Sequence, residues 1–151
     1  MYMDDDFGAG KPAGHNFVST CYPLWAGAAS PAQAASLRDK LNLFERKGGL
    51  QMSDHHSGAQ WDAPFGWAPT NWLAIKGLDD YGFHDDARRL ARKFTATIDH
   101  SLAADGTIRE KYNMVSGDAD VKITAGYEAN VIGFGWTNGV YLKLQNLLQE
   151  P

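Results

Sequence analysis

Apolar residues recur at helical spacing in four stretches of this chain. The stretches are residues 31–46, 70–81, 84–102 and 136–148. Apolar side chains at intervals of three and four lie on one face of an α-helix, so each stretch is expected to form an amphipathic helix. The first has a start signal, Ser30 followed by Pro31, and a double glycine follows its end. The pattern therefore predicts an all-α fold in which the helices bury their apolar faces against one another.

The pattern changes between these helices. Residues 1–23 lack helical periodicity and are rich in Gly, Asp and Pro, which predicts irregular structure with one short strand at about 16–20. Residues 107–113 alternate instead, which predicts an extended segment with Glu110 between two large apolar side chains on one face. A carboxylate in such surroundings is partly desolvated, which suits general-base chemistry. An exposed Glu110 paired with a neighbouring cation fits the same residues.

Residues 60–69, Gln-Trp-Asp-Ala-Pro-Phe-Gly-Trp-Ala-Pro, are unusually rich in aromatic rings and prolines for a connection between helices. The prolines fix their own φ and hold the preceding residues extended, so we expect a stiff loop that leads into a helix. Indole faces beside a carboxylate and an amide suit a sugar, because a pyranose has an apolar face and a rim of hydroxyls. The loop thus predicts sugar contacts by Gln60, Trp61, Asp62 and Trp67. Alternatively, the tryptophans are core anchors between two helices.

A second cluster of glycine and aromatic residues spans 126–139 and opens the last helix. Its glycines allow a close approach of the backbone around Phe134 and Trp136. We do not expect it to bind phosphate, because no Gly-Lys-Ser/Thr follows and no clear strand precedes it.

Adjacent histidines in Asp54-His55-His56 raise the question of a metal site. Adjacent side chains in an extended segment point to opposite sides, and no further His or Cys cluster completes three or four ligands. We therefore expect a solvated loop or the rim of a substrate site, with no metal and no cofactor. The basic residues of stretch 84–102 are expected to form its solvated face.

Charge and composition narrow the class further. The 151 residues carry a net charge of −4, with a pI of about 5.6, which argues against nucleic acid and anionic membranes as partners. The length suits a single domain over residues 1–151. The only cysteine, Cys21, cannot form an internal disulfide. The chain contains no apolar run of the roughly 18 residues that span a membrane, and its acidic start is not a signal peptide, so a cytoplasmic location is favoured.

Three motifs resemble those of the trehalases, glycoside hydrolase family 37. Residues 60–69 match each fixed position of the family's Gln-Trp-Asp-x-Pro-x-Gly-Trp-x-Pro. Residues 110–113, Glu-Lys-Tyr-Asn, are similar to its Glu-Lys-Tyr-Asp/Asn, and residues 133–140 are similar to its closing Gly-Phe-Gly-Trp-Thr-Asn-Gly-Val. Tyr-Pro-Leu-Trp-Ala-Gly at 22–27 also resembles a trehalase segment. The order is the family's own, and the chain resembles the C-terminal third of a trehalase catalytic domain.

This resemblance implies both a fold and a reaction. Trehalases form an (α/α)6 toroid, of which this chain would be a portion. They hydrolyse α,α-trehalose to two glucose molecules with inversion, so one carboxylic acid protonates the bridging oxygen while a carboxylate activates water. The family's base falls on Glu110. Its pocket residues fall on Trp61, Asp62, Phe134 and Trp136.

The chain departs from the family at two points. Trehalases usually carry a substrate-contacting Glu nine residues before the tryptophan of the closing motif. Tyr127 stands at that spacing and Glu128 follows it, so both are candidate substrate contacts, and a disaccharide other than trehalose is an alternative. The segment with the family's acid aspartate is absent.

Inverting hydrolysis needs both carboxyl groups, so the chain alone is expected to be a poor enzyme. An open arc of helices would leave apolar faces uncovered, and we therefore expect self-association or complementation by the missing N-terminal segment. Two other interpretations remain. The chain could be a non-catalytic sugar-binding or assembly module derived from a trehalase, or a helical domain without a sugar function.

Overall fold

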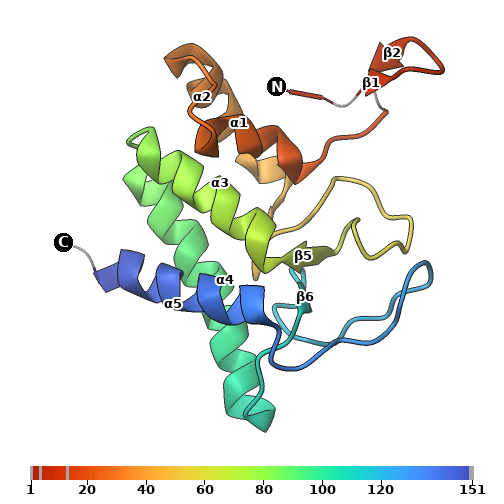
Figure 1. Ribbon diagram of the computed structural model, residues 1–151, viewed down its shortest axis with the longest axis vertical. Helices are drawn as coiled ribbons and strands as arrows, with labels where there is room; N and C mark the ends of the chain where they lie inside the picture. Colours follow the sequence, from red (N-terminus) through yellow and green to blue (C-terminus); the bar gives the residue numbers. More distant parts are fainter. Residues whose placement is uncertain (1, 4, 13, 150–151) are drawn as a thin grey trace.

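The computed structural model describes residues 2–3, 5–12 and 14–149, and helices dominate it (Figure 1). The long helices are α3 (Ala68–Asp80), α4 (His84–Asp105) and α5 (Gly135–Gln149). A tight turn at residues 81–83 sends α4 back along α3, and α5 packs against both. The shorter α1 (Tyr22–Trp25) and α2 (Pro31–Arg38) lie at the N-terminal end of the chain, where α1 packs on α3. The predicted helical class is confirmed.

The strands of the described residues are short and pair antiparallel. They are β1 (Asp5–Asp6) with β2 (Lys11–Pro12), β3 (Glu45–Arg46) with β4 (Gly49–Leu50), and β5 (Phe65–Trp67) with β6 (Lys111–Asn113). In the last pair, Trp67 stands opposite Lys111. A Cβ added at Gly66 would lie 2.6 Å from both the Leu50 carbonyl oxygen and Met114 Cγ, so this approach requires glycine. The β5–β6 pair joins two of the motifs that the sequence singled out.

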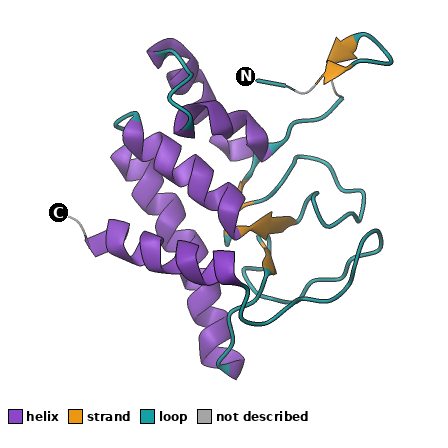
Figure 2. Ribbon diagram, viewed as in Figure 1, coloured by secondary structure: helices purple, strands orange, loops and turns teal. Residues whose placement is uncertain are grey.

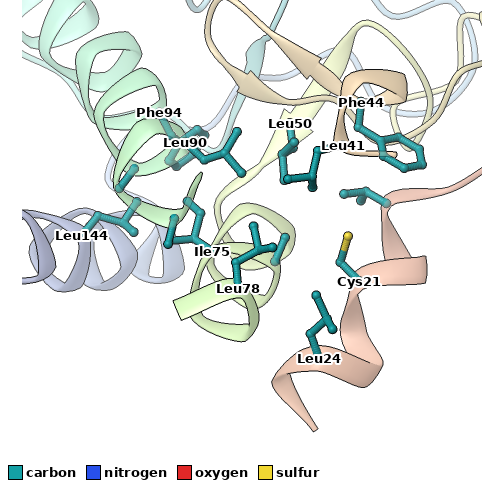
Figure 3. Close-up of a cluster of buried hydrophobic side chains, with 14 of the residues drawn as sticks. Cys21, Leu24, Leu41, Phe44, Leu50, Ile75, Leu78, Leu90, Phe94 and Leu144 are labelled. Atoms are coloured by element: carbon teal, nitrogen blue, oxygen red, sulfur yellow. The ribbon is translucent and has the colours of Figure 1, made fainter. Parts of the chain in front are cut away.

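Apolar side chains from helices α1, α3, α4 and α5 and from β4 form one core (Figure 3). Its fully buried members include Leu24, Leu50, Ile75, Phe94 and Leu144. Burial of this apolar surface is the main contribution that stabilises the packing of the helices. The core thus fixes the ends of the helices from which the long loops of the molecule extend.

Two local predictions are wrong. The segment at 16–20 is not a strand, because residues Val18–Cys21 form a 3-10 helix and only Phe17 bridges to Ser53. The helix predicted over 31–46 ends at Arg38 and is followed by a 3-10 turn at Leu41–Leu43. The spacing of apolar residues indicates which side chains are buried, but it does not specify the backbone. Tight turns after Arg38 bury apolar side chains at the same spacing as a continuous helix would.

An ion-pair network ties the β3 strand and α2 to α4. Arg89 donates to both carboxylate oxygens of Glu45 at 3.0 Å, and Lys93 Nζ lies 2.8 Å from Glu45 Oε1. Asp86 accepts hydrogen bonds from Arg38 Nε at 2.6 Å and from Arg89. Burial alone would raise the pKa of Glu45 and Asp86, but the hydrogen bonds from these cations outweigh it, so both pKa values are lowered.

This network predicts a loss of stability in acid. A carboxylate whose folded-state pKa is lowered contributes stability above its unfolded-state value, near pH 4, and loses it as the pH falls through the folded-state pKa. We expect the free energy of unfolding to fall as the pH drops below about 4, by up to about 1 kcal/mol per carboxylate after allowance for solvent screening of the partly exposed arginines. Urea titrations at several pH values measure it. Glu45→Gln should flatten this slope and Asp80→Asn, in an exposed pair with Lys76, should not; equal slopes in both would contradict the prediction.

No helix in the described ranges is long and apolar enough to cross a membrane.

Candidate functional site

The loops gather on one side of the molecule, beside the β5–β6 pair (Figure 2). Residues 51–64 lead into β5, and residues 114–134 follow β6 and lead into α5. The two loops contact each other at Ala59 and Ala125, which form a bridge, and Gln60 N donates to the Ala125 carbonyl at 3.3 Å. Segments far apart in the sequence therefore meet at one end of the helices.

Four aromatic residues from these loops and from the β5 and α5 elements that follow them form what we call the aromatic cluster: Trp61, Trp67, Phe134 and Trp136. Trp61 stacks on Trp67 with ring centroids 4.0 Å apart and an interplanar angle of 5°. Trp67 meets Trp136 edge-on at 5.7 Å, and Trp136 contacts Phe134 at 4.8 Å. Trp67 is only 1 % exposed, whereas Trp61 is 45 % and Trp136 is 36 % exposed. The core-anchor interpretation thus holds for Trp67, and the other two indoles are partly exposed to solvent.

Glu110 lies directly before β6 and is only 2 % exposed, so the interpretation as an exposed surface pair is wrong. Tyr127 Oη donates a hydrogen bond to Glu110 Oε1, and Lys111 Nζ lies 3.4 Å from Oε2. The Glu110 amide donates to the Val131 carbonyl at 2.9 Å. The carboxylate is therefore buried but has a donor at each oxygen.

Lys111 connects Glu110 to the aromatic cluster. Its side chain is fully buried, and its Nζ donates to the Ala129 carbonyl at 2.9 Å. The same Nζ lies 5.3 Å from the centroid of Trp67 and 3.8 Å from that of Tyr127. A buried ammonium needs such partners, because an uncompensated charge in the interior is very costly. The sequence suggested this lysine only as a surface partner for Glu110. It did not show that β6 is buried on both faces, so that Lys111 and its neighbour Tyr112 are both fully buried.

Asn130 anchors the loop before α5 to the outer edge of β6. Its side chain accepts a hydrogen bond from Lys111 N at 3.1 Å and donates to the Lys111 carbonyl at 2.9 Å and the Ala119 carbonyl at 3.1 Å. Sequence reasoning missed this residue, since an asparagine in a glycine-containing loop is typical of any turn.

The two polar residues of the first loop have different surroundings. The Asp62 carboxylate is buried and accepts hydrogen bonds from Ser53 Oγ, from Ser57 N at 2.9 Å and from Ala63 N at 3.1 Å, so it stabilises the loop. Gln60 Oε1 is buried and has no hydrogen-bond partner among the described residues. The side chain would have to move before Oε1 could accept a hydrogen bond from a ligand.

The two candidates near residue 127 are both exposed. Partial desolvation of the Tyr127 hydroxyl, followed by its hydrogen bond to Glu110, raises the pKa of Tyr127 to about 12. Tyr127 therefore keeps its proton at neutral pH and acts as a donor. Glu128 lies beside it on the loop surface.

The histidine pair lies outside this group of residues. The His55 ring stacks on His15 at 4.9 Å, and Asp54 accepts a hydrogen bond from Asn16 N at 2.8 Å. Within the described residues, no group of three or more His, Cys, Asp or Glu side chains could hold a metal ion.

Comparison with known proteins identifies the family. The family profile described as Trehalase matches residues 1–149, nearly the whole chain. The chain belongs to the trehalase family. This trehalase-family chain is 38 % identical over 155 residues to the periplasmic trehalase of Xanthomonas campestris pv. campestris (strain B100), covering 99 % of the chain and 26 % of that protein. It is 35 % identical over 147 residues to the periplasmic trehalase of Pseudomonas aeruginosa, covering 97 % of the chain and 27 % of that protein.

Solved structures agree with this assignment. The chain matches the neutral trehalase of Saccharomyces cerevisiae with a TM-score of 0.81 and 28 % identity, covering 99 % of the chain and 26 % of that structure. It also matches a family 63 mannosylglycerate hydrolase from Thermus thermophilus, solved with glucose, with a TM-score of 0.71 and 26 % identity, covering 95 % of the chain and 34 % of that structure. The chain therefore matches part of (α/α)6 enzymes and spans about a quarter of the length of the curated trehalases.

Proposed function

We propose that the chain carries the general base and part of the glucose pocket of an inverting, trehalase-type glycoside hydrolase. One observation supports this most directly. Glu110 contacts Lys111 at 3.4 Å, and the same ammonium lies 5.3 Å from Trp67, on which the exposed Trp61 stacks. A buried carboxylate and a sugar-sized aromatic surface therefore belong to one connected group of residues.

In this proposal Glu110 takes a proton from the attacking water, and the ammonium of Lys111, 3.4 Å from Oε2, holds the carboxylate in place. The exposed faces of Trp61 and Trp136 stack on the C–H faces of a glucose ring, with Phe134 beside them. A contact between Gln60 and a sugar hydroxyl stays a prediction, because Oε1 is buried and the side chain would have to turn outward. Trp67 contributes indirectly, because Trp61 stacks on it and is held in place.

The substrate proposed is α,α-trehalose, because the curated relatives are named trehalases. Sugar contacts by Asp62, Tyr127 and Glu128 stay predictions. We propose that the acid lies in the part of the relatives that this chain does not span and that this part completes the (α/α)6 ring. Trp25 on α1 and Leu142 on α5 are among the exposed large apolar residues that such a segment, or a second copy of the chain, would cover.

The proposed function is tested with a chimera, in which this chain replaces the matching 26 % of the X. campestris trehalase. Release of glucose from trehalose by this chimera is expected. If the chimera folds and binds trehalose but does not hydrolyse it, the alternative of a non-catalytic sugar-binding module is favoured.

Trp61→Ala is expected to weaken the binding of trehalose or glucose to the chain by at least about 10-fold, because it removes an exposed stacking face. Isothermal titration calorimetry measures the affinity. Trp25→Ala, which removes an equally exposed indole from α1, is the matched control and should leave the affinity unchanged. Equal affinities for both variants would contradict the proposed sugar site.

A further inference from the structure

Tyr127 reaches from the loop before α5 to the carboxylate of Glu110. Its hydroxyl donates to Oε1, while Lys111 Nζ lies 3.4 Å from Oε2. We propose that Tyr127 is a positioning residue that fixes the orientation of Glu110 for proton abstraction from water. This inference rests on the function proposed above.

The contact is held from three directions. The ammonium of Lys111 lies 3.8 Å from the centroid of the Tyr127 ring, close enough for a cation–π interaction. The same ammonium donates to the Ala129 carbonyl, two residues further along the loop. Asn130 then joins the loop to the backbone of Lys111 by two hydrogen bonds. Together these contacts fix the part of the loop that carries Tyr127 relative to Glu110.

Glu110 requires such a donor. It is almost completely buried, and a buried carboxylate oxygen without a partner carries a large desolvation cost. The phenol is a suitable partner, because its raised pKa of about 12 keeps the proton on Tyr127 at neutral pH. Tyr127 is itself 44 % exposed, so it stands between the buried carboxylate and solvent. It is therefore placed to exclude bulk water from Glu110 Oε1.

The residue type matters at this position. A carboxylate at this position would repel Glu110, whereas the tyrosine hydroxyl donates to it. The contact therefore depends on the phenol of Tyr127, together with its Lys111 and Asn130 anchors.

The contact itself is tested on the whole chain by NMR of tyrosine labelled with ¹³C at Cζ. The Tyr127 signal, assigned by its absence in Tyr127→Phe, should shift in Glu110→Gln, because its hydroxyl then donates to a neutral amide in place of a carboxylate. The signal of Tyr141, which donates to Asp99, should stay where it is in that variant. If the Tyr127 signal is the same in the wild type and in Glu110→Gln, the two side chains are not in contact and the inference is overturned.

The role is tested in the trehalase chimera. Tyr127→Phe keeps the ring over Lys111 but loses the donor, so kcat should fall about 10- to 100-fold with KM changed by less than about threefold, since a hydrogen bond to a charged group is lost. The acid limb of the pH–rate profile should move to higher pH, because the ionised carboxylate loses a stabilising donor. Tyr141→Phe removes a tyrosine hydrogen bond to Asp99 on the helices and is the matched control.

The outcomes separate the two proposals. A Tyr127→Phe chimera with the kcat and pH profile of Tyr141→Phe would overturn the positioning role and leave the proposed function intact. A loss confined to KM would also overturn it, because it would make Tyr127 a substrate contact. An inactive wild-type chimera would overturn the proposed function, and the positioning role with it.

Discussion

Glu110→Gln is expected to lower kcat of the trehalase chimera by at least about 10²- to 10⁴-fold, the usual range for loss of general acid–base catalysis. The amide keeps the size of the side chain and can still accept a hydrogen bond from Tyr127, but it cannot take a proton from water. KM should change little, because the stacking faces of Trp61 and Trp136 are unaffected. Steady-state assays of glucose release measure both constants.

Glu128→Gln provides the comparison for this assignment. Glu128 is a second carboxylate, on the loop that carries Tyr127. It is exposed, whereas Glu110 is buried beside Lys111. Its replacement should reduce kcat far less than Glu110→Gln does. The reverse order of effects would show that the base is Glu128 and would refute the role proposed for Glu110.

Trp67→Ala is expected to lower the free energy of unfolding by about 3–5 kcal/mol, the usual cost of removing a fully buried large aromatic side chain. The substitution would empty the space between Trp61, Trp136 and Lys111, and Nε1 would no longer donate to the Gln60 carbonyl at 2.9 Å. Sugar binding should be lost as well, since Trp61 has nothing else to stack on. Urea denaturation followed by circular dichroism gives the unfolding free energy.

Trp61→Ala is the natural control for stability, because it removes the more exposed ring of the same stacked pair. Its side chain is 45 % exposed, so a smaller cost, about 1–2 kcal/mol, is expected. The two tryptophans would then separate, with Trp67 needed for folding and Trp61 for binding. Similar costs for both variants would contradict this division.

The helices were predictable from the sequence because burial on one face repeats with the helical period. The stretches at 70–81, 84–102 and 136–148 correspond to α3, α4 and α5 within a few residues. The first stretch failed after Arg38, where consecutive tight turns bury Leu41 and Phe44 at a similar spacing. Periodicity reports burial, and only hydrogen bonding decides whether the backbone stays helical.

The candidate site was predictable in its parts but not in its connections. The resemblance to trehalase motifs marked Glu110 and Trp61, because the residue types alone fitted a surface ion pair and core anchors as well. Nothing in the sequence indicated that Asn130 would clamp β6 or that Asp62 would turn inward to Ser53 and the loop backbone. These roles depend on which side chains meet across loops separated by many residues.

The amino-acid sequence by itself determined the helical class, the resemblance to trehalases and the residue types of the site, since each depends on local spacing and chemistry. Only the tertiary structure decided which tryptophan is buried and which is exposed, that Lys111 is buried between Glu110 and Trp67, and that Tyr127 donates to Glu110. The physical reason is that burial and hydrogen-bond partnership are properties of pairs of segments, and the β5–β6 pairing brings together residues more than 40 positions apart.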